Sequence, residues 1–214
     1  MSRVRIKICG ITTAADARLA ADAGADAVGI NFYPKSPRFV DPRLAPAIIQ
    51  VLPPMIDAVG VFVDTPMRQI CAIAFQLGLG SVQSFACVGS LDDAKPFRHI
   101  AAFRVKSSED VRMIHEYVRI STEANRRPAA VLVDAHVEGQ FGGTGKTAPW
   151  DLLVDFHPDI PWILAGGLTP DNVAEAIRLL RPYAVDVASG VESSPGRKDP
   201  EKLRRFVENV RAAY

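Results

Sequence analysis

The stretch Trp162-Ile163-Leu164-Ala165-Gly166-Gly167-Leu168 joins an apolar run of strand length to a pair of glycines. The same arrangement precedes it, where Ala130-Val131-Leu132-Val133-Asp134 leads to Gly142-Gly143-Thr144-Gly145, and follows it, where Val185-Asp186-Val187-Ala188 leads to Ser189-Gly190-Val191. The glycines recur about 24 residues apart, an interval typical of βα units in a barrel. Glycine lets backbone N–H groups and a helix N-terminus approach an anion closely, so the pattern predicts strand ends that bind phosphate.

Apolar, β-branched runs alternate with amphipathic or alanine-rich runs along the whole chain, which is typical of a parallel sheet wrapped by helices. Strands are expected near Arg5–Cys9, Ala27–Phe32, Asp57–Val63, Gly80–Gln83, Ile100–Val105, Ala130–Asp134, Trp162–Ala165 and Asp186–Ala188. Helices are expected near Thr13–Ala23, Pro42–Leu52, Pro66–Gly78, Glu109–Ala124, Pro149–Asp155, Pro170–Leu180 and Pro200–Ala212. The fourth crossover, around Ser90–His99, has the weakest helical pattern.

Eight strands and about as many helices in 214 residues predict a compact α/β protein, a (β/α)8 TIM barrel that forms a single domain over residues 1–214. In such a barrel the active site lies at the C-terminal ends of the strands. An open, doubly wound sheet is the alternative fold.

The composition is that of an ordinary globular protein, with 48% hydrophobic and 23% charged residues. A formal net charge of +1 and the lack of a basic block predict no nucleic-acid partner and no binding to an anionic membrane. We therefore expect a small molecule as the partner. The chain runs from Met1 straight into a strand-like segment, with no apolar signal core, so a cytoplasmic location is expected.

Cysteine and histidine are too scattered to indicate a metal site. Cys9, Cys71 and Cys87 form no CxxC pair, which argues against both a disulfide framework and a zinc cluster. The four histidines, at His99, His115, His136 and His157, show no HxH or HExxH spacing. No metal is predicted, and the cysteines are expected to be thiols.

The glycine-rich segment ending in Gly145-Lys146-Thr147 resembles a nucleotide-binding loop at first sight. A P-loop requires glycine five residues before the glycine of its GK[ST] ending, and Gln140 occupies that position here. The dinucleotide pattern GxGxxG is absent as well. The segment is better explained as part of a sugar-phosphate site.

An ordered series of motifs along nearly the whole chain resembles the phosphoribosylanthranilate isomerase family. The motifs are Lys7-Ile8-Cys9-Gly10-Ile11-Thr12, Ser36-Pro37-Arg38-Phe39-Val40, Gly60-Val61-Phe62-Val63, Val133-Asp134 with Gly142-Gly143-Thr144-Gly145, Ala165-Gly166-Gly167-Leu168-Thr169-Pro170-Asp171-Asn172-Val173, and Asp186-Val187-Ala188-Ser189-Gly190-Val191-Glu192 followed by Pro195-Gly196-Arg197-Lys198-Asp199. The resemblance implies a (β/α)8 barrel of tryptophan biosynthesis that needs no cofactor and converts an N-(5-phosphoribosyl)anthranilate aminoaldose into a 1-deoxyribulose ketose.

This Amadori rearrangement requires an acid to open the furanose ring and a base to remove the proton on C2. The resemblance implies that Cys9 is the base and Asp134 the acid, each at the end of an expected strand. A thiol must be partly ionised to act as a base, and Lys7 or Arg38 could supply the positive charge. The alternative for Cys9 is a small buried core residue, and the alternative for Asp134 is a carboxylate that caps the end of a strand.

The resemblance also implies a set of substrate-binding residues. A guanidinium suits bidentate binding of a carboxylate, so Arg38 is expected to bind that of anthranilate, although a solvated loop charge is the simpler alternative. The glycine junctions are expected to bind phosphate, although glycines often serve only turns and helix ends. The implied residues at these junctions and beside them are Gly143, Gly166, Gly167, Asp186, Ser189 and Gly190.

The chain departs from the family pattern after the fourth expected strand. The usual pattern is close to Val-Gln-Leu-His-Gly, whereas this chain has Val82-Gln83-Ser84-Phe85-Ala86 and no histidine. Phe85 is expected either to stack on the anthranilate ring or to fill the core beneath the loop. His136 is expected to be an exposed loop residue rather than a replacement, and Cys71 a residue of helix core.

Two rival functions remain open from the sequence. One is a different aldose–ketose isomerase or an epimerase acting on a sugar phosphate, and the other is a non-catalytic barrel that only binds phosphate. The absence of a paired-Asp or metal-His arrangement argues against the first, and the presence of Cys9 with Asp134 argues against the second. Either a monomer or a homodimer is compatible with the sequence.

Overall fold

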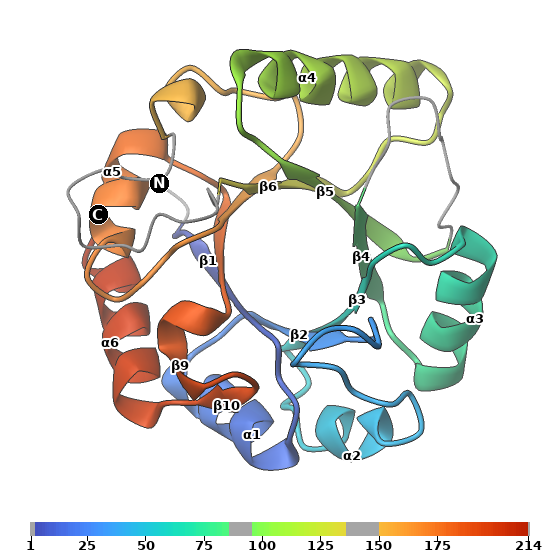
Figure 1. The fold of residues 1–214 in the computed structure, drawn as a ribbon, viewed down its shortest axis with the longest axis vertical. Helices are drawn as coiled ribbons and strands as arrows, with labels where there is room; N and C mark the ends of the chain where they lie inside the picture. Colours follow the sequence, from blue (N-terminus) through green and yellow to red (C-terminus); the bar gives the residue numbers. More distant parts are fainter. Residues whose placement is uncertain (1–2, 86–95, 136–149, 214) are drawn as a thin grey trace.

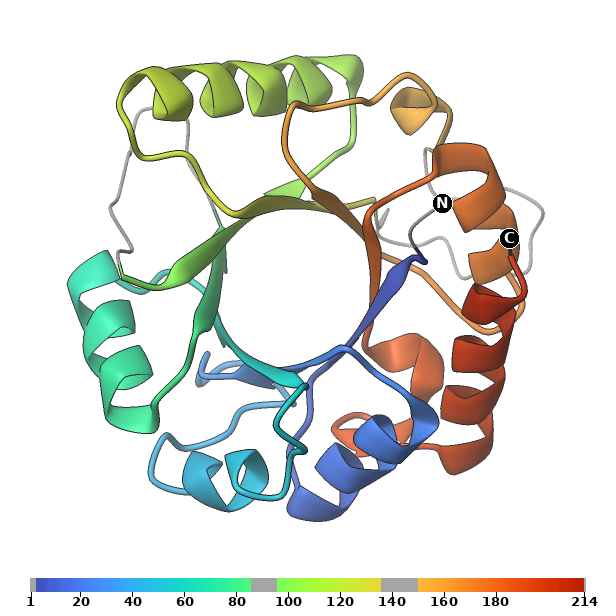
Figure 2. The ribbon, with the colours of Figure 1, turned by 180° about the vertical axis from the view of Figure 1, so that it is seen from behind.

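The structure of the protein is a computed structural model that describes residues 3–85, 96–135 and 150–213. Eight parallel strands form a closed barrel in chain order, and helices surround it (Figure 1). Figure 2 shows the same ring from behind. The strands are β1 (Arg5–Cys9), β2 (Ala27–Asn31), β3 (Asp57–Phe62), β4 (Ser81–Phe85), β5 (Arg98–Arg104), β6 (Ala130–Asp134), β7 (Trp162–Ala165) and β8 (Ala184–Val187).

The barrel closes where the first strand pairs with the last. β1 and β8 run parallel, with Lys7 opposite Asp186 and Ile8 opposite Val187. The predicted (β/α)8 barrel is therefore confirmed, and the open-sheet alternative is wrong because an open sheet lacks this pairing. The strand bounds differ from expectation mainly at β4, which extends to Phe85, and at β8, which begins at Ala184.

The helices lie close to their expected positions but are often shorter. The helix predicted near Pro42–Leu52 is only the five-residue α-helix Ala45–Ile49, and the described part of the one predicted near Pro149–Asp155 is the 3-10 helix Trp150–Leu153. The predicted fourth crossover falls mostly outside the described residues, and its last residue, His99, is already part of β5. The observed elements are α1 (Ala14–Ala23), α2 (Ala45–Ile49), α3 (Met67–Leu77), α4 (Ser108–Glu123), η1 (Trp150–Leu153), α5 (Val173–Leu180), η2 (Ser189–Val191) and α6 (Pro200–Arg211).

Local hydrogen bonds explain where several helices begin and end. The Thr13 side chain accepts a hydrogen bond from the Asp16 N–H at the start of α1, and Gly24 ends that helix in the left-handed conformation. Ser107 and Asp110 form a reciprocal capping box at the start of α4. Pro170 does not begin a helix, because α5 begins three residues later at Val173. The Asn172 side chain accepts a hydrogen bond from the Thr169 N–H in the loop before it.

Side-chain alternation along the strands divides the core into two layers. Outward residues such as Ile8, Val133 and Val185 pack under the helices in the larger layer. Inward residues of small or medium size fill the barrel itself, among them Val59, Ala102 and Leu132. The inner apolar layer has no member from β1, where Lys7 and Cys9 occupy the alternate positions instead.

A short antiparallel hairpin, which the sequence analysis did not predict, follows β8. It consists of β9 (Glu192–Ser194) and β10 (Arg197–Lys198), with Gly196 at a positive φ of 79° in its turn. In Figure 1 the hairpin lies beside α1 and β1, at the seam where the barrel closes. It carries most of the Pro195–Asp199 motif, so that motif has a structural location outside the eight-stranded barrel.

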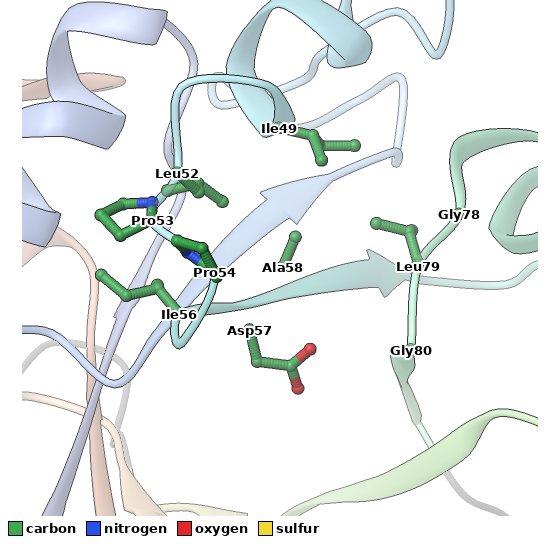
Figure 3. A pocket seen from close by; sticks show the side chains of 10 residues that line it. All are labelled: Ile49, Leu52, Pro53, Pro54, Ile56, Asp57, Ala58, Gly78, Leu79 and Gly80. Atoms are coloured by element: carbon green, nitrogen blue, oxygen red, sulfur yellow. The ribbon is translucent and has the colours of Figure 1, made fainter.

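A pocket of about 240 Å³ lies at the opposite rim, at the N-terminal ends of β3 and β4 (Figure 3). Most of its lining residues are apolar, among them Pro53, Pro54 and Leu79, and the carboxylate of Asp57 lies at one side. Because all eight strands are parallel, this pocket is remote from the rim where Cys9 and Asp134 end their strands. In the described part of the chain, no helix has the length and apolar character needed to span a membrane.

Candidate active site

The C-terminal ends of the strands bring most of the predicted site residues to one rim of the barrel. Cys9 ends β1 and Asp134 ends β6. Gly166 and Gly167 follow β7, and the Ser189–Val191 turn follows β8. Because β7 and β8 lie between β6 and β1, the two glycine-bearing ends separate the two predicted catalytic residues around the ring. Gly143 and His136 lie outside the described residues.

Cys9 and Lys7 point into the barrel because the intervening Ile8 points outward into the helix-facing core. Gly29 lies opposite Cys9 on β2 and leaves the space that both side chains use. A methyl group added at Gly29 would lie 2.8 Å from the Cys9 sulfur and 3.2 Å from the Lys7 nitrogen. The thiol and the ammonium are therefore packed closely over this glycine.

Lys7 forms a buried ion pair with Asp186 across the β1–β8 seam. Its Nζ lies 2.8 Å from the Asp186 carboxylate, and their side chains are only 4% and 9% exposed. Burial lowers the pKa of Lys7, but the charges of Asp186 and Cys9 outweigh burial and raise that pKa above its ordinary value. Lys7 is therefore a permanent cation beside Cys9, and its charge is largely neutralised by Asp186.

The environment of Cys9 contains opposing influences on its ionisation. Burial raises the pKa of the thiol, Lys7 and Lys198 lower it, and Asp186 raises it. Burial prevails, so the pKa lies above the ordinary value for cysteine. Lys7 has the position expected of an activating cation, but its charge only partly offsets the rise in the Cys9 pKa that burial causes.

Asp134 lies half-buried at the end of β6, between the ends of β5 and β7. In the strand register it faces Arg104 on one side and Ala165 on the other. Because Val133 belongs to the outer core, Asp134 points toward the barrel axis, as does Arg104 after the outward Phe103. This position is compatible with proton donation to a ligand at the mouth of the barrel.

Arg38 lies in the loop after β2, and its guanidinium is occupied by Glu192 of the hairpin. Nε and Nη2 donate to the two carboxylate oxygens at 2.9 Å and 2.6 Å. The hydrogen bonds to Glu192 are the main reason that the pKa of Arg38 is raised. Arg38 is therefore not the solvated loop charge considered above, and its expected role with the anthranilate carboxylate remains a prediction.

The loops after β7 and β8 form one tightly packed unit. Gly166 and Gly167 have positive φ values of 90° and 66°, and the Asn172 side chain holds this loop through the Gly167 carbonyl and the Thr169 N–H. A methyl group on Gly190 would lie 1.9 Å from the Leu168 carbonyl oxygen. Gly190 thus permits close contact between the two loops, a requirement separate from any space for an anion.

The sequence analysis did not assign roles to two further polar groups of β4 and β5. Gln83 alternates with the outward Val82, so it faces the barrel interior, and its buried Oε1 has no hydrogen-bond partner in the described ranges. The Arg104 guanidinium lies 4.9 Å from the centre of the Phe85 ring. Phe85 is 37% exposed, so the expectation that it fills the core is wrong.

The arrangement offers a thiol and a carboxylate for proton transfer, two glycine loops for an anion, and an acceptor oxygen at Gln83 for a ligand hydroxyl. Lys7, Gly29, Glu192 and Lys198 complete its surroundings. Sequence reasoning named Lys7 as a source of positive charge for Cys9 but assigned no role to the other three. A signal existed for Glu192 and Lys198, since both belong to the motif series near the C-terminus. No sequence pattern could single out Gly29, because the space it leaves matters only once β2 is paired with β1 and Cys9 lies opposite it.

Comparison with known proteins gives a consistent result. A family model described as N-(5′-phosphoribosyl)anthranilate isomerase matches residues 6–209. The N-(5′-phosphoribosyl)anthranilate isomerase of Geobacter sulfurreducens is 45% identical over 209 residues, covering 97% of this chain and 98% of the relative.

Solved structures of the same enzyme have the same fold as this chain. The Thermotoga maritima phosphoribosyl anthranilate isomerase aligns with a TM-score of 0.84 at 36% identity, covering 98% of this chain and 99% of that one. Another structure of that enzyme is described as monomers generated from a dimeric isomerase. A phosphoribosyl anthranilate isomerase in complex with reduced 1-(o-carboxyphenylamino)-1-deoxyribulose 5-phosphate aligns with a TM-score of 0.80 at 34% identity, with 98% and 99% coverage.

The space above Gly29 can be tested by Gly29→Ala. The added methyl group must displace the Cys9 sulfur and the Lys7 ammonium, so we expect a loss of about 1–3 kcal/mol in the free energy of unfolding. Gly80→Ala is the matched control, because its methyl group would lie 3.3 Å from the exposed guanidinium of Arg98 and 3.8 Å from the Asp57 carboxylate, with no closer described atom. Urea denaturation measures the free energy of unfolding of both variants. Equal losses in the two would contradict close packing of Cys9 and Lys7 over Gly29.

Proposed function

The chain belongs to the N-(5′-phosphoribosyl)anthranilate isomerase family, and from this we propose how its residues divide the reaction. It is an aldose–ketose isomerase of tryptophan biosynthesis, which decides against the two rival functions left open by the sequence. The observation that supports our assignment of roles is that Cys9 and Asp134 end their strands at the rim that also carries the glycine loops.

In the proposed mechanism, Asp134 donates a proton to the furanose ring oxygen as the C1–O bond breaks. The nitrogen lone pair forms the C1=N bond of a Schiff base. The Cys9 thiolate then removes the proton on C2, the electrons of that C–H bond form the C1=C2 bond, and the π electrons of the C1=N bond return to nitrogen to give an enolamine. Tautomerisation to the ketone places a proton on C1 and completes the isomerisation. Because burial raises the pKa of Cys9, the thiolate is the minor form near neutral pH, and the positive charges of Lys7 and Lys198 lower the cost of forming it.

The phosphate group is proposed to lie at the ends of β7 and β8. Gly166 and Gly167 have left-handed backbone conformations there, and a methyl group on Gly167 would meet no atom of the described residues within 4 Å. This space is available to a bound anion. Ser189 and Gly190 supply the adjacent turn, and Gly143 is proposed as a third contributor.

The anthranilate group is proposed to lie toward Arg38 and Phe85. Glu192 uses Nε and Nη2 of Arg38, so an added carboxylate must approach the remaining edge of the guanidinium or share it. Phe85 already has Arg104 over its ring, which leaves the opposite ring face for stacking with the substrate. Asp186 is proposed to contact a sugar hydroxyl with the carboxylate oxygen opposite to the one that Lys7 uses.

The remaining partner assignments follow the same reasoning. We propose that the sugar-phosphate substrate is the partner and that neither nucleic acid nor a membrane takes part. A monomer or a homodimer in the cytoplasm is proposed, supported by the Thermotoga maritima relative described as dimeric. Sedimentation of the purified protein distinguishes these two oligomeric states.

The activity itself is tested with freshly prepared phosphoribosylanthranilate. Conversion, coupled to the next enzyme of the pathway, removes the anthranilate fluorescence, so the decay of fluorescence gives the rate. No turnover at high enzyme concentration would contradict the assignment of this isomerase activity and require a different substrate.

We expect Cys9→Ser and Asp134→Asn each to lower kcat by about 10²- to 10⁴-fold, the usual effect of removing a general base or acid. Both variants are expected to keep the native circular dichroism spectrum, because neither residue belongs to the apolar core. Alkylation of Cys9 should inactivate the enzyme, and a substrate analogue should protect it. Unaltered turnover in either variant would refute the role of that residue.

We expect Gly167→Ala to raise KM more than it lowers kcat. The methyl group extends into the open space proposed for the phosphate, and the φ of 66° adds about 1–2 kcal/mol of backbone strain. Gly78→Ala is the matched control, since it has a similar φ of 64° and open space but ends α3 away from the glycine loops. Equal KM values in both variants would argue against phosphate at β7.

We expect Arg38→Ala to lower kcat/KM for the full substrate by about 2–4 kcal/mol, since a substrate carboxylate would lose a charged partner. An analogue without the carboxylate should be affected much less. The Arg38 pair also stabilises Glu192, so the free energy of unfolding must be measured alongside. Equal losses for both substrates would show that Arg38 acts through Glu192 or the phosphate instead.

A further inference from the structure

The β9–β10 hairpin makes contacts with both sides of the closing seam. Thr12, after β1, donates a hydrogen bond to the Gly196 carbonyl at 2.6 Å. The Asp199 N–H donates to the Val191 carbonyl at the base of the hairpin. Lys202 donates to the Glu192 carbonyl at 2.9 Å. The Thr12 bond joins the hairpin to the segment after β1, and the other two hold its base and join it to α6.

Lys198 is entirely enclosed in this arrangement, with a side-chain exposure of 0%. Its Nζ donates to the Cys9 carbonyl at 2.6 Å, to the Ala188 carbonyl at 3.2 Å and to Glu192 Oε1 at 2.9 Å. One ammonium group thus joins the end of β1, the end of β8 and the hairpin. Burial lowers the pKa of Lys198, and the pair with Glu192 opposes that effect.

Glu192 connects Lys198 to Arg38. Besides Lys198, its buried carboxylate accepts from both edge nitrogens of Arg38, and its Oε1 lies 3.3 Å from the Gly196 nitrogen. Burial raises the pKa of Glu192, but the hydrogen bonds from Arg38 and Lys198 outweigh burial and hold that pKa below its ordinary value. We call Arg38, Glu192 and Lys198 the clasp.

The clasp lies directly against the residue that follows Cys9. Gly10 has a positive φ of 73°, and a methyl group on it would lie 2.3 Å from Arg38 Cδ. The Arg38 side chain therefore crosses the backbone immediately after the thiol. With two cations and one anion, the clasp has an excess positive charge beside Cys9. The charged groups that influence the thiol from the surrounding elements are Lys7 on β1, Asp186 on β8, Lys198 on β10, and Arg38 after β2.

We propose that Glu192 and Lys198 are positioning residues for the isomerisation. They fix the Cys9 strand end and the Arg38 guanidinium, and the positive charges of Lys198 and Arg38 favour the Cys9 thiolate. This inference rests on the proposed role of Cys9 as the base. The clasp links the group that removes the proton to the group proposed to bind the anthranilate carboxylate.

The buried charges of Lys198 and Glu192 support an electrostatic role of the clasp in addition to holding the hairpin. A fully buried ammonium loses its hydration, and apolar residues of similar volume often stabilise a protein as well as a buried ion pair does. Lys198 gives one hydrogen bond to the Cys9 backbone and also lowers the cost of ionising its thiol. A hairpin held by apolar contacts would supply neither.

The test is the rate of Cys9 alkylation by iodoacetamide as a function of pH, followed at the Cys9 peptide by mass spectrometry. Lys198→Met removes a cation, so we expect slower alkylation below the thiol pKa, by about three- to tenfold, and a profile displaced to higher pH. Glu192→Gln removes the anion, so we expect faster alkylation below that pKa together with a raised KM. A role limited to holding the hairpin would change both variants in the same direction.

Lys202→Met is the matched control, since it removes a lysine that also binds the hairpin but does so at the Glu192 carbonyl. We expect the pH profile of Cys9 alkylation in Lys202→Met to match that of the protein without a substitution. An unshifted profile in Lys198→Met, or an equal shift in Lys202→Met, would overturn the inference. If Lys198→Met does not fold, the direction of the Glu192→Gln shift decides the question. Full turnover in Cys9→Ser would instead refute the base assignment, whatever the alkylation profiles show.

Discussion

The ion pair between Lys7 and Asp186 crosses the seam where the barrel closes, and the rest of the site is organised around it. Either charge alone in this interior would be strongly destabilising, by about 3–5 kcal/mol for a buried pair that loses one partner. Because the two residues belong to the first and last strands, their mutual neutralisation requires the barrel to be closed. Closure of the fold and assembly of the charged surroundings of Cys9 are therefore one event.

Burial and charge act against each other at Cys9. Loss of solvent raises the pKa of the thiol, which makes the thiolate scarcer but a stronger proton acceptor, and the nearby lysines lower that pKa. Lys7 and Lys198 limit the cost of that ionisation without removing it. The lack of a Cβ on Gly29 makes this possible, since the thiol and the Lys7 ammonium share the space above it.

Much of the fold could be predicted from the sequence, because eight β-branched runs at regular intervals permit few arrangements. The predicted bounds of β1, β6 and β7 match the structure, whereas the helices near Pro42 and Pro149 were overestimated because proline marks a possible start without supplying the apolar face that sustains a helix. For the site, Cys9 and Asp134 could be located at strand ends. The partnership of Arg38 with Glu192 could not, because 154 residues separate them and no local pattern connects them.

The hairpin shows why a barrel needs structure beyond its eight strands at the active rim. Each strand positions its own terminal residue, but the relative placement of a loop residue such as Arg38 depends on contacts outside the sheet. Glu192 supplies such a contact, and Lys198 transmits it to the Cys9 backbone through a single buried ammonium. A carboxylate bound at Arg38 would compete with Glu192 for the same guanidinium and so alter the charge balance beside the thiol. With the roles proposed for Arg38 and Cys9, substrate recognition and the ionisation of the base would be coupled through contacts that lie outside the parallel sheet.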